Sequence, residues 1–315
     1  MEFKHFSVML KECIEGLNIQ PAGIYIDGTL GGAGHSFEIV KQLSNKGKLI
    51  AFDKDETALE FSKEKLKQSL DKVYFIHNDF KNFASELDKL GIEKVDGILL
   101  DLGVSSYQID TAERGFSYIQ DAPLDMRMDT SANLTAFEVV NYYTESELVD
   151  IFSKYGEEPF SKRIASSIIV NRKIKPINTT LELSNIIEKA VPSKEKHKNG
   201  HPAKRVFQAL RIEVNGELDK LYDCILSMAR RLNTNGRMCV LTFHSLEDRI
   251  VKDAFNLLNS DCICDKHLPV CVCHHKKEVI LVNKKPITAS EEELKINPRS
   301  HSAKLRIIEK ISSFL

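Results

Sequence analysis

A glycine-rich turn between a strand-like run and a helix-like run most constrains the fold of this chain. An alternating apolar run ends in Asp27, three glycines follow within residues 31–34, and a helix-compatible segment covers residues 36–43. Glycine lets the backbone adopt positive φ and approach a ligand closely, and the N-terminus of a following helix favours polar or anionic groups. The pattern therefore predicts the first strand, turn and helix of a nucleotide-type cofactor cradle.

Three further strand-like runs also end in acidic residues, namely Asp53, Asp79 and Asp101. Asp53 comes about 20 residues after the glycines, the offset at which a carboxylate holds a ribose diol. Because open α/β sheets bind ligands at the carboxyl ends of their strands, these acids and Asp27 are expected to line one edge. The alternative interpretation is that each acid only caps the helix after its strand.

An acidic edge discriminates between two kinds of adenosine-containing cofactor. It would repel a pyrophosphate, but it would attract a sulfonium and an α-amino group and accept hydrogen bonds from an adenine amine. The glycines also fit the dinucleotide pattern G-x-G-x-x-G poorly, because the chain reads Gly31-Gly-Ala-Gly34. The residues therefore favour S-adenosylmethionine over a nicotinamide dinucleotide.

Length and composition set wider limits. A chain of 315 residues can form one large domain or two unequal ones. The net charge of −1 gives no general attraction to nucleic acid or membrane, so an RNA site must be a local patch. Neither the N-terminus nor a later segment has an apolar run long enough to span a bilayer, which predicts a soluble, cytoplasmic protein. Without a secretory signal, the seven cysteines are expected to be reduced.

The strand and helix pattern predicts two domains. It runs to Asp101 and breaks at a polar loop, and an irregular, charged stretch over residues 111–131 reads as an ordered functional loop. Capping boxes at Thr144 and Thr179 then predict helices.

We expect an inserted, mostly helical substrate-recognition domain over residues 110–202, with residues 1–109 and 203–315 forming the sheet domain. One long helix is expected after Pro202, with an apolar face from Phe207 to Met228. Strands are expected at 236–243, 279–282 and 305–308.

Eight blocks occur in order along the chain. They are Asp27-Gly-Thr-Leu-Gly-Gly-Ala-Gly-His-Ser36, Asp101-Leu-Gly-Val-Ser-Ser106, Arg114-Gly-Phe-Ser117, Leu124-Asp-Met-Arg-Met128, Phe160-Ser-Lys-Arg163, His201-Pro-Ala-Lys-Arg-Val-Phe-Gln-Ala-Leu-Arg211, Thr242-Phe-His-Ser-Leu-Glu-Asp-Arg249 and Ser302-Ala-Lys-Leu-Arg306. Together they resemble the bacterial ribosomal RNA small-subunit methyltransferase H family nearly end to end. The resemblance implies an α/β fold, a class I S-adenosylmethionine-dependent methyltransferase (Rossmann-like) sheet with an inserted helical domain. It also implies N4-methylation of a cytosine in the decoding region of 16S ribosomal RNA.

The resemblance further implies a set of cofactor-binding residues. They are Ala33, Gly34, His35, Asp53, Phe80, Asp101 and Gln108. Asp53 is expected at the ribose, Phe80 beside the adenine, and Asp101 with Gln108 near the methionine end. For His35 the alternative is a neighbour of a helix N-cap without a ligand role, and for Phe80 it is ordinary core.

Methyl transfer from a sulfonium needs alignment and exclusion of water more than covalent help. The catalytic candidates are Asp101 as acceptor of the cytosine N4–H, Ser105 and Ser106 as loop donors, and Phe243 with His244 as the wall of the base pocket. For Phe243 and His244 the alternative is a strand end followed by a helix cap at Ser245.

Two basic clusters in the insertion and its hinge could follow RNA phosphates. The first holds Lys162, Arg163, Arg172, Lys173 and Lys175, and the second Lys194, Lys196, Lys198, Lys204 and Arg205. Arg211 is expected at the rim of a cleft and joins the RNA-binding candidates. The expected partner is 16S ribosomal RNA within the small subunit, and a solvated helix face is the alternative for these clusters.

The stretch from Cys262 to Cys273 stands outside the family blocks. Its two Cys-x-Cys pairs could give four thiolates to Zn²⁺, but Cys-x₂-Cys is the more usual spacing and adjacent pairs strain tetrahedral geometry. Packing of small residues in a β-hairpin with reduced thiols is the favoured interpretation, so no metal is predicted.

Two other functions stay open at the level of sequence. One is methyl transfer to another acceptor, such as DNA cytosine or a protein side chain, although Asp101-Leu-Gly-Val104 departs from the Asp/Ser-Pro-Pro-Tyr block typical of DNA amino-methyltransferases. The other is a non-catalytic RNA-binding assembly factor. The sequence leaves the oligomeric state open, a homodimer included.

Overall fold

The computed structural model describes residues 7–195, 200–265, 268 and 270–312. It divides into two compact units. The first, which we call the sheet unit, comprises the described residues up to Gly103 and from Leu218 onward, and the second, the helical unit, covers Val104–Glu217. Within the described ranges, no helix is long and apolar enough to cross a membrane.

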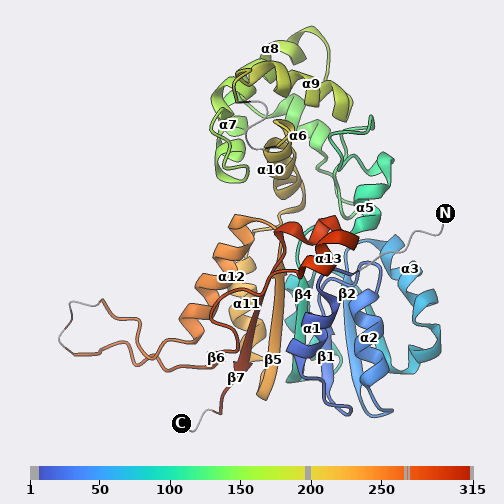
Figure 1. The fold of residues 1–315 in the computed structure, drawn as a ribbon, viewed down its shortest axis with the longest axis vertical. Helices are drawn as coiled ribbons and strands as arrows, with labels where there is room; N and C mark the ends of the chain where they lie inside the picture. Colours follow the sequence, from blue (N-terminus) through green and yellow to red (C-terminus); the bar gives the residue numbers. More distant parts are fainter. Residues whose placement is uncertain (1–6, 196–199, 266–267, 269, 313–315) are drawn as a thin grey trace. The chain divides into compact units, whose positions relative to one another are not determined.

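The sheet unit is built on seven strands in the order β3-β2-β1-β4-β5-β7-β6 (Figure 1). The strands are β1 (Ile24–Asp27), β2 (Lys48–Asp53), β3 (Val73–His77), β4 (Val95–Asp101), β5 (Leu232–Thr242), β6 (Val279–Leu281) and β7 (Lys304–Lys310). The first five are parallel, and β7 runs antiparallel to both of its neighbours. The strand order reverses between β1 and β4, the switch point at which such sheets bind ligands. This arrangement confirms the predicted Rossmann-like α/β class.

Helices cover both faces of the sheet. They are α1 (Leu10–Leu17), α2 (Gly34–Gln42), α3 (Glu56–Lys65), α4 (Phe83–Lys89), α11 (Leu221–Arg230), α12 (Ser245–Leu258) and α13 (Glu291–Ile296), with 3₁₀ turns η1 (Lys67–Lys72), η2 (Phe80–Asn82) and η4 (Pro298–Ser302). Successive strand residues point to opposite faces. Ile26 therefore joins the core beneath α4, α11 and α12, whereas Tyr25 joins the core beneath α1, α2 and α3. Figure 1 draws α11 and α12 on one side of the sheet and α1 and α2 on the other.

The helical unit holds its own apolar core. Its elements are α5 (Ser106–Asp110), η3 (Ala112–Arg114), α6 (Ala136–Tyr142), α7 (Glu145–Lys154), α8 (Ser161–Ile174), α9 (Thr180–Ala190) and α10 (Ala203–Asn215). Thr144 and Thr179 form the predicted capping boxes with Glu147 and Glu182. The irregular stretch before α6 is ordered by side-chain bonds to the backbone, since Arg114 Nη2 donates to the carbonyls of residues 127 and 128 at 2.9 and 2.8 Å.

The single long helix expected after Pro202 is wrong. It is two helices, because α10 ends at Asn215, Gly216 takes a left-handed φ of 56°, and α11 begins only at Leu221. The apolar spacing carries across the break, but the two halves serve different cores. Phe207 packs in the helical unit, and Ile225 packs in the sheet unit. The helical unit therefore extends over residues 104–217 rather than the expected 110–202.

Gly115 offers a test of the packing in the helical unit. It has a φ of +72°, and a Cβ built there would lie 2.3 Å from the Pro123 carbonyl oxygen and 2.9 Å from the Asp125 nitrogen. Because both are backbone atoms, neither can rotate away. Gly115→Ala should destabilise the protein by about 2 kcal/mol or more, as measured by urea unfolding.

Gly91→Ala is the matched control. Gly91 also has a positive φ, of +67°, but nothing lies within 4 Å of its ideal Cβ. This variant should be destabilised by only about 1 kcal/mol, the cost of placing a residue with a Cβ in the left-handed region. Equal losses in the two variants would show that no backbone clash exists at Gly115.

Candidate functional site

The strand register places two acids beyond the carboxyl end of β1. Asp27 lies level with Ala51 of β2 and Leu99 of β4, so Asp53 and Asp101 each stand two residues further along. They end the strands on either side of β1, and the glycine turn that follows β1 lies between these strands. The predicted acidic edge is thus built around the switch point of the sheet.

Asp27 supports the glycine turn from beneath. Its side chain is 1% exposed, its Oδ1 accepts the Thr29 N–H at 3.1 Å, and its Oδ2 accepts the Ser36 hydroxyl at 2.6 Å. Burial raises the pKa of Asp27 to about 6, although these hydrogen bonds work in the opposite direction. Asp27 therefore joins the strand end to the first turn of α2 and is not open to a ligand.

Asp53 fastens the glycine turn from the side of β2. Its Oδ2 accepts the Gly31 N–H at 2.7 Å, and its Oδ1 accepts the N–H of Asp55 at 2.9 Å. On the other side, the hydroxyl of Ser62 and the ammonium of Lys65 donate to the carbonyls of residues 31 and 32 at 3.0 and 2.7 Å. The turn is closed by hydrogen bonds of the chain itself, so its shape is preorganised.

Two glycines near the turn have close neighbours. A Cβ at Gly34 would lie 1.7 Å from the Ser7 hydroxyl, and one at Gly28 would lie 2.4 Å from Leu100 Cδ2 and 3.1 Å from Cβ of Phe80. Phe80 is partly buried and packs against the apolar core, so it borders the turn and belongs to the core at once. Ala33 adopts a left-handed φ of 53° directly before α2.

Asp101 is the most perturbed acid at this edge. Its backbone N–H donates to the Thr29 hydroxyl at 2.6 Å, and a quarter of its side chain, 25%, stays exposed. Burial, with the negative charges of Asp27 and Glu247, raises the pKa of Asp101 to about 8. A carboxyl with such a pKa lacks compensation by positive charge, so the position suits a cationic group.

His35 lies beside Asp101 but is held from the other side. Its Nε2 is 3.0 Å from the Val8 carbonyl oxygen, which can only accept, so Nε2 carries the hydrogen. Its Nδ1 is 3.7 Å from Asp101 Oδ2, too long for a hydrogen bond. The buried ring therefore ties the N-terminal segment to α2 and forms one wall beside the carboxyl of Asp101.

Asp79 caps the helical turn that follows its strand, which is the alternative role considered for these acids. Its Oδ1 accepts the Lys81 N–H at the start of η2 at 2.9 Å, and its Oδ2 pairs with Lys54 Nζ at 3.3 Å. The expected row of four ligand-facing acids is therefore corrected. Asp27 and Asp79 hold the backbone, and Asp53 does so as well. A carboxylate oxygen can accept more than one hydrogen bond, so Asp53 and Asp101 are kept as the candidates for a ligand.

The helix cap after β5 falls one residue earlier than expected, at His244 instead of Ser245. Its ring accepts the Glu247 N–H at 3.5 Å, and its Nε2 lies 3.1 Å from Glu247 Oε1. Both nitrogens thus face the first turn of α12, an arrangement that favours capping over contact with a base. Phe243 is half-buried beside Gly103, at 3.6 Å from the ideal Cβ of that glycine.

Two residues were missed by sequence reasoning. The buried Glu247 accepts the backbone N–H of Phe243 at 2.9 Å and raises the pKa of Asp101. The spacing of His244 and Glu247 is that of a capping box, which is the signal that could have found it. Thr29 carries no comparable signal, because its bond to the Asp101 N–H joins segments 72 residues apart.

Three candidates on the chain after Asp101 belong to the helical unit. Ser105 caps α5, where its hydroxyl accepts the Gln108 N–H at 3.2 Å and its own N–H donates to Gln108 Oε1 at 3.1 Å. Gln108 is 5% exposed. The structure brings these two together in one capping box. Ser106 begins α5, and its side chain lies outside the described part of the structure.

The basic candidates of the helical unit differ in what they contact. Lys162, Arg163 and Lys204 are exposed at the beginnings of α8 and α10. Arg205 donates from Nη1 to the Glu157 carbonyl at 3.1 Å. Arg211 forms two bonds to Glu217, at 2.7 and 2.8 Å, and its side chain is only 16% exposed. This pairing favours a positioning role for Arg211 over phosphate binding.

The remaining members of the two clusters are also mixed. Arg172 donates to the Val140 carbonyl at 2.7 Å and Lys175 pairs with Glu182 at 2.8 Å, whereas Lys173 and Lys194 are exposed. Lys196 and Lys198 lie outside the described residues.

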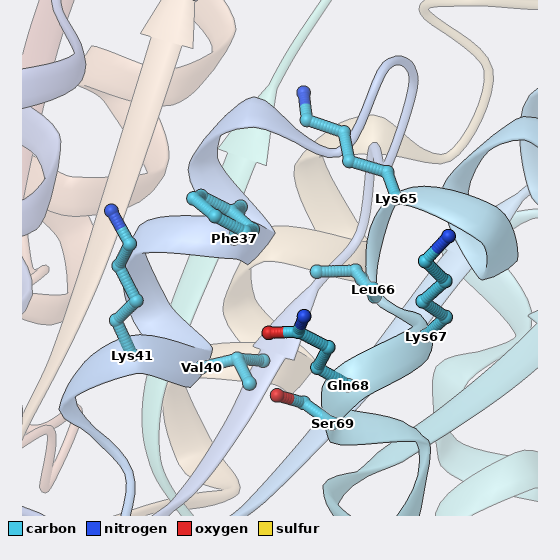
Figure 2. Close-up of a pocket in the computed structure, with 8 residues that line it drawn as sticks. All are labelled: Phe37, Val40, Lys41, Lys65, Leu66, Lys67, Gln68 and Ser69. Carbon is cyan, nitrogen blue, oxygen red and sulfur yellow. The ribbon is translucent and has the colours of Figure 1, made fainter.

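A hollow of about 330 Å³ lies elsewhere on the sheet unit (Figure 2). It lies between α2 and the chain from the end of α3 into η1. The lining residues are Phe37, Val40, Lys41, Lys65, Leu66, Lys67, Gln68 and Ser69. Three lysines without an acid in the lining do not suit a cationic donor, so we do not assign this hollow to the cofactor.

Comparison with known proteins gives one consistent family. The model of the MraW methylase family matches residues 2–311. The chain is 56% identical over 311 residues to the ribosomal RNA small subunit methyltransferase H of Clostridioides difficile strain 630, covering 99% of this chain and 100% of that protein. It is 54% identical to the protein of the same name from Finegoldia magna, with coverage of 99% and 100%. An rRNA methylase structure from Streptococcus thermophilus is 13% identical with a TM-score of 0.39, covering 96% of this chain and 94% of that one, a likeness too weak to add to the fold.

Asp101→Asn should make the ligand-free protein more stable at alkaline pH. A carboxyl whose folded pKa lies above its unfolded value stabilises the folded state below about pH 4, and this contribution is lost as the pH rises through 8. The amide does not titrate. The Tm of the variant relative to the wild type should therefore increase between pH 4 and pH 9, as measured by thermal unfolding.

Asp248→Asn is a control in which the change of stability with pH should have the opposite sign, because the pKa of Asp248 is lowered and not raised. Arg306 Nε lies 2.7 Å from Asp248 Oδ1, and the hydrogen bonds and charge of Arg306 hold the pKa of Asp248 below its usual value despite partial burial. The stability of this variant relative to the wild type should fall as the pH rises from about 2 to 5, because the wild-type carboxylate gains its pairing with Arg306 over that range. The variant should stay less stable than the wild type at higher pH. A constant offset of Asp101→Asn across all pH values would contradict the uncompensated charge at Asp101.

Proposed function

The chain belongs to the MraW methylase family, and on that basis we propose that it transfers a methyl group from S-adenosylmethionine to ribosomal RNA of the small subunit. The proposed acceptor is the exocyclic N4 of a cytosine in the decoding region of 16S ribosomal RNA, as the sequence resemblance implies. One observation carries the proposal. A preformed glycine turn lies between two strands that end in Asp53 and Asp101, and Asp101 lacks positive compensation.

The charges of this edge fit the donor. Burial and the negative charges of Asp27 and Glu247 raise the pKa of Asp101. The positive charges of a sulfonium and an α-amino group would offset both effects, whereas a pyrophosphate would add further repulsion. We assign Asp53 to the ribose diol, Phe80 to the adenine and Asp101 to the methionine end. Ala33, Gly34 and His35 would line the turn around the donor. Gln108 remains a proposed contact at the methionine end.

The chemistry requires little from the protein beyond positioning. S-adenosylmethionine supplies a methyl group that is already activated on sulfur. When bound, this donor would give its methyl carbon to N4, and the electron pair of the broken carbon–sulfur bond would stay on sulfur. Ionised Asp101 would accept the N4–H, orient the nitrogen lone pair and take the released proton. Because the base must leave its stack to reach this edge, Phe243 is proposed as a wall that receives it.

The helical unit is proposed to bind RNA. With a net charge of −1 the whole chain offers no general attraction, so local exposed cations must supply it. Lys162, Arg163 and Lys204 are such cations, and Arg205 extends the second group. We place the reaction in the cytoplasm, with the small ribosomal subunit as the proposed substrate particle.

Labelled methyl transfer tests the activity directly. Small subunits from cells that lack the enzyme should receive the label on one cytosine N4 of 16S ribosomal RNA, located by mass spectrometry of RNA fragments. Asp101→Ala should lose roughly 10²-fold or more of the rate, because it removes the acceptor at the reacting nitrogen.

The alternatives give different results in the same experiment. If the label appeared on DNA or on a ribosomal protein, that molecule and not the cytosine N4 would be the acceptor. Binding to small subunits without any transferred label, by a protein that binds S-adenosylmethionine, would indicate an assembly factor and refute the proposed reaction.

RNA binding is tested by removing two charges from α8. The Lys162→Ala, Arg163→Ala double variant should bind RNA on the order of tenfold more weakly, and the slope of log affinity against log salt should fall by about one for each lost phosphate contact. The control is Lys11→Ala with Lys46→Ala, which removes the same charge from exposed positions of the sheet unit. Equal effects of the two double variants would argue against a site on α8.

A further inference from the structure

Four cysteines converge in the long segment between α12 and β6. We call Cys262, Cys264, Cys271 and Cys273 the cysteine cluster. Their four Sγ atoms all lie within 4.8 Å of one another, and all four thiols are free. In Figure 1 this orange segment extends away from α12 and β6. The cluster is thus separate from the acidic edge, and the proposed methyl transfer does not use it.

The spacing of the sulfur atoms matches the edges of a tetrahedron around one ion. Four of the six pairs stand 3.5, 3.6, 3.7 and 3.9 Å apart. In a tetrahedral site with Zn–S bonds of about 2.3 Å, neighbouring sulfurs stand about 3.8 Å apart. Cys271 and Cys273 are themselves 3.6 Å apart, so the Cys-x-Cys spacing does not prevent this geometry.

Backbone N–H groups point at three of the sulfurs. The N–H of Ile263 donates to Cys273 Sγ at 3.4 Å, that of Cys264 to Cys262 Sγ at 3.4 Å, and that of Val272 to Cys264 Sγ at 3.3 Å. Hydrogen bonds to sulfur stabilise negative charge on it and are the outer partners expected of metal-bound thiolates. The backbone thus offers donors to three of the four sulfurs, as metal-bound thiolates would require.

The expected packing of small residues in a β-hairpin is not found. The described residues of this segment form no strand. The apolar side chains between the cysteines are exposed, with Ile263 at 53%, Val270 at 70% and Val272 at 64%. A segment that buries so little apolar surface lacks the usual means of holding a fixed conformation and needs another constraint, such as a metal.

We propose that the cysteine cluster binds one Zn²⁺ ion that holds this segment in its folded form. Four thiolates on one ion form a closed, structural site without an open position for substrate. The sulfur separations suit a single ion, whereas a cluster of several irons would hold its thiolates further apart. The base of the segment is fixed independently, since His275 Nε2 lies 3.0 Å from the Leu257 carbonyl and the Glu278 N–H donates to that of Leu258 at 2.8 Å.

Metal analysis of the full chain tests this site. Protein made without a histidine tag and purified without chelators should contain close to one zinc per chain. The Cys271→Ser, Cys273→Ser double variant should lose it, and Cys224→Ala, which changes a cysteine of the sheet core, should keep it. Protein refilled with Co²⁺ should show the absorption of tetrahedral cobalt thiolate.

Limited proteolysis supplies a readout that does not depend on the variants. Removal of zinc by a chelator should open the segment to cleavage, and added ZnSO₄ should restore its protection. Wild-type protein that binds no stoichiometric zinc after incubation with ZnSO₄ would overturn the proposal, as would zinc retained by the double variant or iron bound in its place.

Discussion

Unrelieved negative charge at one edge of the sheet is the constraint on which the site depends. Burial, with the nearby charges of Asp27 and Glu247, raises the pKa of Asp101 to about 8, and the charge of Asp53 adds to the causes that raise the pKa of Asp27. Such an arrangement costs folding free energy whenever the carboxylates ionise. A cationic ligand would offset that cost, so the burial that weakens the ligand-free fold would also favour binding of a sulfonium donor, as proposed for Asp101.

The topology explains how one chain combines this edge with an inserted helical unit. The chain leaves the sheet unit at Gly103, two residues after Asp101, and returns at Leu218 before β5. The insertion therefore begins at the ligand edge of the sheet. Each unit has its own apolar core, so each packs its own apolar side chains.

Much of the fold and part of the site could be predicted from sequence, because both are encoded by local patterns. Apolar runs ending in Asp53 and Asp101 gave two sheet strands, and Thr144 and Thr179 marked helix starts. The single helix after Pro202 failed because apolar spacing does not reveal the left-handed turn at Gly216. The roles of Asp79 and His244 depend on which groups tertiary packing brings near them. For the cysteine cluster, the spacing suggested four thiolates for one ion, but it did not show that the four sulfurs converge.

The central claim is that a cation compensates Asp101, and it is tested by calorimetry of S-adenosylmethionine binding in two buffers of different ionisation enthalpy at pH 6.5. At that pH an α-amino group is already protonated, while a carboxyl of pKa about 8 still holds its proton. The account predicts binding with net proton release, and loss of that release in Asp101→Asn. Absence of binding, or binding with the same heat in both buffers, would contradict it.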